Sequence, residues 1–139
     1  MAYLIGVLLA LGVGLLGTFS GLERERAFYT VITIVVSTYY GLYAVLGGSV
    51  PVLLQEGVVI ALYIVGSLVG FRRNFWLVAA LLAGHGLFDA VHGFFITNPG
   101  MPAWWPAFCG AFDLAAGAYL AVRIRQSTVS APPPPANTP

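Results

Sequence analysis

The stretch VPVLLQEGVVIALYIVGSLVGF, residues 50–71, decides the fold class of this chain. Its only side chain that is charged at neutral pH is Glu56, and the pair Arg72 and Arg73 follows it directly. A helix needs about 20 mainly apolar residues to cross a hydrocarbon core about 30 Å thick. This stretch is therefore long enough and apolar enough to form a transmembrane helix.

Four other runs have the same character. The five expected spans are approximately Ala2 to Phe19, Phe28 to Leu46, Val50 to Phe71, Phe75 to Ile96 and Trp105 to Val122. The 139 residues are 59% hydrophobic and 8% charged, whereas soluble domains are roughly 45–50% apolar and 25% charged. We predict an all-α integral membrane bundle of five transmembrane helices over residues 1–126, followed by a disordered Pro-rich tail over residues 127–139.

The basic residues predict the orientation of the bundle. All six are arginines, in three pairs: Arg24 with Arg26, Arg72 with Arg73, and Arg123 with Arg125. They occupy the first and third connections and the segment after the last span, and the connections that carry Lys and Arg face the cytoplasm. We expect a multi-pass protein of the cell (inner) membrane with its N-terminus outside and its C-terminus cytoplasmic. The net charge of +1 excludes a nucleic-acid partner, which requires a basic surface.

Small residues mark the first span as a packing helix. Gly6, Ala10 and Gly14 recur at four-residue spacing, which lets another helix approach closely, either within the bundle or in a homo-oligomer. The turn 23–26 after this span is expected to be solvated at the membrane interface. No internal repeat is expected along the chain.

Five ionisable side chains lie inside the expected spans, where a mid-membrane charge costs about 2.5–3.5 kcal/mol. With a helical rise of about 1.5 Å per residue, their depths below the outer boundary are ~6 Å for His92, ~9 Å for Glu56, ~10 Å for Asp89, ~12 Å for Asp113 and ~16 Å for His85. The five can therefore meet in one buried site. Cys109, one turn before Asp113, offers a soft ligand there, although a lone cysteine is more often a small apolar core residue.

The fourth span carries the pattern H-x3-D-x2-H. At ~100° per residue, His85, Asp89 and His92 fall within about 60° of one another. Imidazole and carboxylate suit zinc, iron or copper, so we predict these three residues as ligands of a divalent transition metal. Glu56 and Asp113 are expected as further ligands or as the catalytic base. Because the two histidines lie ~10.5 Å apart along the axis, one of them can instead support a ligand, or two ions can share Asp89.

Charge balance leaves three functions open. The spans hold three carboxyl groups and no Lys or Arg, so a metal ion, protonated histidines or protonated carboxyl groups must supply the balance. If a metal ion balances the carboxylates, we expect a metal-binding protein, and by extension a membrane metalloenzyme acting on an apolar or lipid-like small molecule. Protonation predicts a metal-free isomerase or ligand pocket for a lipid or sterol. A network of hydrogen bonds, worth about 0.6 kcal/mol each, predicts a scaffold or assembly subunit.

The residues Gly84 to His92, followed by 105–109 and Asp113, resemble an uncharacterised family of small bacterial multipass membrane proteins. The resemblance covers the last two spans and implies that His85, Asp89, His92, Pro106, Cys109 and Asp113 belong to one pattern. In architecture alone, the chain is similar to the five-helix sterol-isomerase (emopamil-binding) group. That likeness implies proton chemistry on a lipid.

Overall fold

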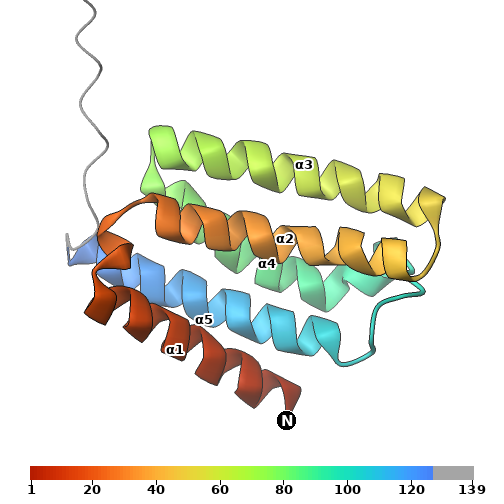
Figure 1. Ribbon diagram of the computed structural model, residues 1–139, viewed down its shortest axis with the longest axis horizontal. Coiled ribbons are helices and arrows are strands. Elements are labelled where there is room, and N and C mark those ends of the chain that lie inside the picture. The colour runs from red at the N-terminus through yellow and green to blue at the C-terminus, as the bar shows by residue number, and fades with distance from the viewer. Residues whose placement is uncertain (127–139) are drawn as a thin grey trace, which may run out of the picture.

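The computed structural model describes residues 1–126 as five long helices, with no strand in that range. They are α1 (Ala2–Ser20), α2 (Ala27–Leu46), α3 (Val50–Arg72), α4 (Phe75–Phe95) and α5 (Trp105–Arg125), and a short 3-10 helix, η1 (Leu22–Arg24), follows α1 (Figure 1). All five are long and apolar enough to cross a membrane, which confirms the predicted all-α, multi-pass fold class. The predicted tail, residues 127–139, lies outside the described residues.

Local sequence explains where the helices begin and end. The Ser49 side chain accepts a hydrogen bond from the Val52 amide, and the Asn74 side chain accepts one from the Trp76 amide, so both act as N-caps. Pro51 and Pro106 lie in the first turns of α3 and α5, where a missing N–H costs nothing. The end of α5 was predicted too early, at Val122, because the arginines of its last turn ended the apolar run.

Each helix packs mainly on one or two others: α5 on α1 and α4, and α3 on α2 and α4. Neighbours in space are therefore not always neighbours in sequence. Figure 1 shows α1 and α3 at opposite edges of the bundle, with α2, α4 and α5 between them. The buried residues of α1 are Gly6, Ala10, Gly14 and Gly17. A Cβ on Gly14 would lie 3.0 Å from the ring of Tyr119 in α5. The small-residue row therefore packs within the chain, which was one of the two predicted alternatives.

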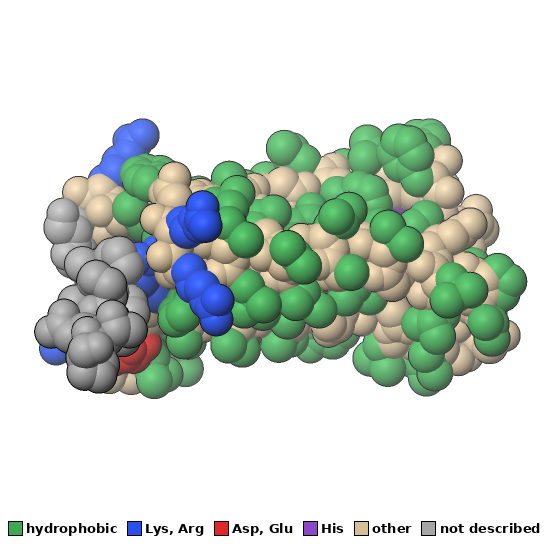
Figure 2. Space-filling view, turned by 90° about the horizontal axis from the view of Figure 1, so that it is seen from above, with side chains coloured by type: hydrophobic (Ala, Val, Ile, Leu, Met, Phe, Trp, Pro, Cys, Tyr) green, Lys and Arg blue, Asp and Glu red, His purple; other side chains and the backbone are tan. Residues whose placement is uncertain are grey.

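All six arginines lie at one end of the bundle, which we call the arginine end; the opposite end is the far end. Figure 2 shows arginine side chains gathered there, while apolar side chains cover the visible flank. The exposed arginines are Arg24, Arg72, Arg73 and Arg125. This separation of charged and apolar surface is what a bundle in contact with lipid requires.

The turn 23–26 corrects one expectation, because two of its four residues are buried rather than solvated. Glu23 and Arg26 are only 2% and 5% exposed. Glu23 forms an ion pair with Arg123 of α5 and accepts a hydrogen bond of 2.9 Å from Thr18. Arg26 donates to the Gly70 carbonyl at 3.0 Å, at the end of α3, and burial lowers the pKa of its guanidinium. The turn therefore joins three helices at the arginine end.

Candidate metal centre

The site is built where α4 crosses α5 with almost no space between the backbones. A Cβ added to Gly86 would lie 2.7 Å from the Gly110 carbonyl oxygen, and one added to Gly110 would lie 3.0 Å from the Gly86 carbonyl oxygen. Such reciprocal contacts exclude any side chain larger than hydrogen at both positions. The residues beside these glycines are consequently brought close to the partner helix.

Four buried side chains meet at this crossing. They are His85 and Asp89 from α4, and Cys109 and Asp113 from α5, each at most 2% exposed. One ligand atom from each residue lies within 4.8 Å of all the others. Bonds of about 2.0–2.3 Å place the donor atoms of a tetrahedral zinc site roughly 3.3–3.8 Å apart. This quartet, which we call the four-donor cluster, can therefore hold a metal ion after small side-chain adjustments.

Hydrogen bonds already join the members of the four-donor cluster. His85 Nδ1 lies 2.7 Å from Asp113 Oδ2 and 3.8 Å from Asp89 Oδ1. The Cys109 thiol donates to Asp113 Oδ2 at 3.6 Å. A divalent ion would take the place of the protons in these contacts and balance the two carboxylates, because ligands must be deprotonated to bind a metal.

Several polar atoms of the four-donor cluster are left without a partner. Within residues 1–126, His85 Nε2, Asp89 Oδ2 and Asp113 Oδ1 are buried and have no hydrogen-bond partner. An unpaired buried polar atom costs about 1–3 kcal/mol. In proteins the usual partner of such an atom is a bound ion, water or ligand. These three atoms are therefore the positions at which the cluster would bind one.

Tyr40 of α2 supports the four-donor cluster from outside. Its hydroxyl donates to Asp89 Oδ1 at 2.5 Å, which holds that carboxylate in one orientation. The Tyr40 ring also stacks on His92, with ring centroids 4.0 Å apart. Tyr63 of α3 presents an edge to the His85 ring at 4.9 Å. Two aromatic rings thus fix the positions of the imidazoles.

The second group of buried polar side chains is separate from the four-donor cluster. His92 Nε2 lies 2.9 Å from Glu56 Oε1. The Asn98 amide donates to the same Glu56 oxygen at 3.0 Å and to the Tyr40 carbonyl at 2.9 Å. We call this group, His92 with Glu56 and Asn98, the His-Glu-Asn group. It binds the loop between α4 and α5 to α2 and α3.

The predicted motif is therefore divided between two groups. Its three residues do lie on the buried face of α4, but His85 and Asp89 meet α5, whereas His92 meets α3. His92 lies outside the four-donor cluster, because its ring nitrogen pairs with Glu56, and its role as a metal ligand stays a prediction. Asp113 joins the four-donor cluster as one of the two predicted alternatives, and Glu56 does not.

The sequence analysis treated Cys109 mainly as an apolar core residue. A short sequence similarity between α4 and α5 could have indicated that Cys109 belongs to the cluster. The sequence His85-Gly86-Leu87-Phe88-Asp89 matches Cys109-Gly110-Ala111-Phe112-Asp113 at three of five positions, with a metal-binding residue type first in each. Because the two helices run in opposite directions, the shared pattern places two donors from each around the shared glycine crossing. No comparable sequence pattern indicated that Asn98 and Tyr63 lie at the site.

A hollow of about 710 Å³ reaches the four-donor cluster at the far end. It lies between α1, α4 and α5, and its lining includes Asp89, Gly86 and Gly110 with several alanines. The small side chains leave the space, and Asp89 is the one ionisable residue of the cluster on its wall. The hollow therefore ends beside the cluster at Asp89, whose side chain is itself buried.

Comparison of the chain with known protein families, curated proteins and solved structures finds no match. The resemblance stated from Gly84 to Asp113 therefore stays a prediction.

Proposed function

We propose that this protein is a membrane-embedded metal-binding protein whose four-donor cluster holds one divalent transition metal. The observation that supports this most directly is the convergence of four donor residues within 4.8 Å in a buried crossing. Nitrogen, sulfur and oxygen donors together suit zinc, iron or copper. The metal would also offset two of the three negative charges that the deprotonated donors Asp89, Cys109 and Asp113 carry, in spans that contain no Lys or Arg.

Elemental analysis of the protein purified in metal-replete medium tests the proposal. We expect one metal ion per chain in the wild type and a loss in His85→Ala. The matched control is His92→Ala, which removes the same side chain from the same helix but outside the four-donor cluster, and should keep the metal. A metal-free wild type, or metal that depends on His92 and not on His85, would refute the proposal.

Cobalt substitution identifies the thiol ligand separately. A cobalt ion bound by a thiolate has a charge-transfer absorption that nitrogen and oxygen ligands do not give. We expect this band in the wild type and not in Cys109→Ser, the chain having one cysteine. A band of unchanged intensity in Cys109→Ser would exclude Cys109 as a ligand.

We further propose that the site acts on an apolar or lipid-like substrate. The support is the hollow, which leads to the four-donor cluster at Asp89 and lies among lipid-contacting helices. In this function His85, Cys109 and Asp113 hold the metal, which would polarise the substrate or activate a bound water. Asp89 would then serve as a fourth ligand that can exchange or as the general base. Comparing lipid extracts of cells that express the wild type or Asp89→Asn would reveal a consumed or produced lipid; identical extracts would count against catalysis.

A metal-free proton-transfer pocket is the second candidate. It is supported by two His–carboxyl pairs at 2.7 and 2.9 Å, His85 with Asp113 and His92 with Glu56. In this function the histidines supply the positive charge, and the pairs move protons on a lipid or sterol-like ligand. A metal-free wild type whose effect on the lipid extract is lost in Glu56→Gln would favour it over the metal site.

A further inference from the structure

A groove runs along the flank of the bundle, between α1 and α2 and away from the hollow. These two helices follow one another in sequence but hardly touch, because α1 packs on α5 and α2 packs on α3. In Figure 1 they separate from their connection at the arginine end towards the far end. The floor of the opening is α5.

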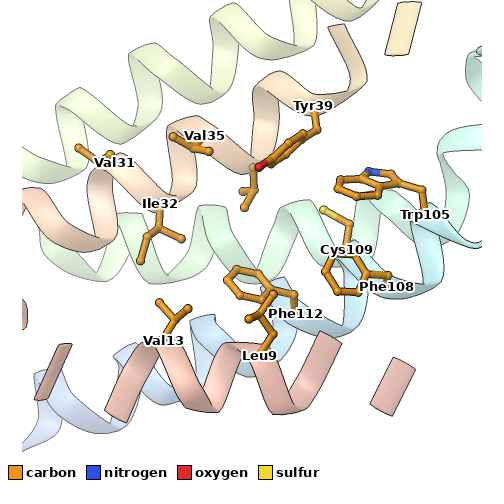
Figure 3. A pocket seen from close by; sticks show the side chains of 11 residues that line it. Leu9, Val13, Val31, Ile32, Val35, Tyr39, Trp105, Phe108, Cys109 and Phe112 are labelled. Atoms are coloured by element: carbon orange, nitrogen blue, oxygen red, sulfur yellow. The ribbon is translucent and has the colours of Figure 1, made fainter. Parts of the chain in front are cut away.

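The groove has a volume of about 260 Å³, and its walls are apolar. Figure 3 shows the side chains that line it; they include Val13, Val31, Val35, Tyr39, Trp105 and Cys109. We call this space the lateral groove. Val31 and Val35 are 54% and 44% exposed and form its rim, so the groove opens sideways rather than towards the ends of the bundle.

We propose that the lateral groove binds one acyl chain of a bilayer phospholipid. An apolar cavity of this size does not hold water well, and an unfilled one forfeits the dispersion contacts of its walls. The groove lies between two membrane-spanning helices and is open along their flank. The surrounding hydrocarbon that can enter it is the acyl chain of the neighbouring lipid, which runs parallel to the helices.

The far end of the groove offers a polar group to the rest of the lipid. The Tyr39 hydroxyl points into the groove in Figure 3. Trp105 lines the same end of the groove with its ring, but its Nε1–H is buried. An ester carbonyl oxygen at the head of an acyl chain is an acceptor for the Tyr39 hydroxyl. Tyrosine and tryptophan commonly occupy this depth of a membrane because one part is apolar and the other polar.

The groove also reaches the four-donor cluster. Cys109 lines the groove, and its thiol donates to Asp113 in the cluster. An acyl chain in the groove therefore lies against one side of the cluster, while the hollow opens to Asp89 on another. Occupancy of the groove excludes water from the Cys109 side. The acyl-chain site does not depend on a bound metal.

Native mass spectrometry of protein released from vesicles of palmitoyl-oleoyl phosphatidylethanolamine tests this proposal. We expect one phospholipid retained per wild-type chain and almost none in Val31→Phe/Val35→Phe, whose rings fill the groove from its rim. The matched control is Val65→Phe/Val69→Phe, the same change at the same spacing on exposed positions of α3. Thermal unfolding of all three proteins verifies that they fold.

The outcomes separate this proposal from the metal site. Equal phospholipid retention by the wild type and the groove variant would overturn the acyl-chain site, as would retention of a sterol or isoprenoid in place of phospholipid from mixed vesicles. Tyr39→Phe should retain less phospholipid than the wild type, because the ring remains but the hydroxyl is lost. Elemental analysis of the same samples should give equal metal content in the wild type and the groove variant, so that failure of one proposal leaves the other standing.

Discussion

Tyr40 contacts both buried polar groups, and its hydroxyl is expected to control the orientation of Asp89 in the four-donor cluster. Tyr40→Phe keeps the ring that stacks on His92 but removes the donor to Asp89 Oδ1, 2.5 Å away. Loss of a partner to a buried polar atom costs about 1–3 kcal/mol. Loss of such support for a ligand typically weakens metal affinity roughly 10–100-fold.

Competition with a chelator, together with thermal unfolding, measures both effects of Tyr40→Phe. The control is Tyr43→Phe, one turn along α2, which also removes a tyrosine hydroxyl but leaves the Tyr40 donor to Asp89 in place. An affinity for metal that is equal in the two variants would show that Tyr40 does not orient Asp89.

At this scale the sequence predicted which residues are buried together but not how they pair. The calculated depths do order the pairs, since His92 and Glu56 lie at ~6 and ~9 Å and Asp113 and His85 at ~12 and ~16 Å below the outer boundary. What was missing was the order of the helices in space. The sequence does not show that α4 lies between α3 and α5. It therefore could not indicate that His85 and Asp89 face α5 while His92 faces α3.

At the scale of the helices, the glycine crossing of α4 and α5 sets the geometry of the site. Gly86→Ala would place a methyl group 2.7 Å from the Gly110 carbonyl oxygen and force the helices apart. Overpacking of this kind costs about 1–3 kcal/mol. We therefore expect a lower unfolding temperature in detergent and a lower metal content.

Gly84→Ala is the matched control for this prediction. A Cβ on Gly84 meets nothing within 4 Å, and alanine is favoured over glycine inside a helix by roughly 0.5–1 kcal/mol. The unfolding temperature of Gly84→Ala should equal or exceed that of the wild type. Equal effects of the two substitutions would mean that the close crossing contributes nothing specific.

The connection between α1 and α2 gives a second prediction at this scale. Glu23→Ala removes the acceptor of hydrogen bonds from Thr18 and Arg123, and hydrogen bonds to charged groups are worth about 1.5–3 kcal/mol. Glu25→Ala, two residues further on, changes an exposed side chain and should alter stability by no more than about 0.5 kcal/mol. Chemical unfolding in mixed micelles compares the two, and a Glu23→Ala protein as stable as Glu25→Ala would contradict the role of this turn.

Hydropathy predicted the helices well, because each span must be apolar along its length whatever it packs against. It could not predict that Glu23 and Arg26 are buried. A charged turn between two spans has the same hydropathy whether it faces water or the ends of other helices. The small residues Gly6, Ala10 and Gly14 correctly indicated a packing face. Only the structure identified α5 as the helix on which that face packs.

For the whole molecule, the separation of charges has a consequence for orientation. Every arginine lies at one end, while the four-donor cluster, the hollow and the Trp105 end of the lateral groove lie towards the other. If the arginine end is cytoplasmic, as the positive-inside rule predicts, both proposed binding sites are reached from the outer half of the membrane. A substrate or metal would then arrive without crossing the bilayer.

Cysteine labelling of intact cells tests that orientation directly. In a Cys109→Ser background, Thr97→Cys places a thiol in the exposed connection at the far end, and Gln126→Cys places one at the arginine end. A membrane-impermeant maleimide should label Thr97→Cys on intact cells and label Gln126→Cys only after the cells are opened. The reason is that translocation of the arginine-bearing connections is disfavoured, so the three arginine pairs act together to keep that end inside. Labelling of Gln126→Cys from outside would reverse the orientation and place both sites in the cytoplasmic half of the membrane.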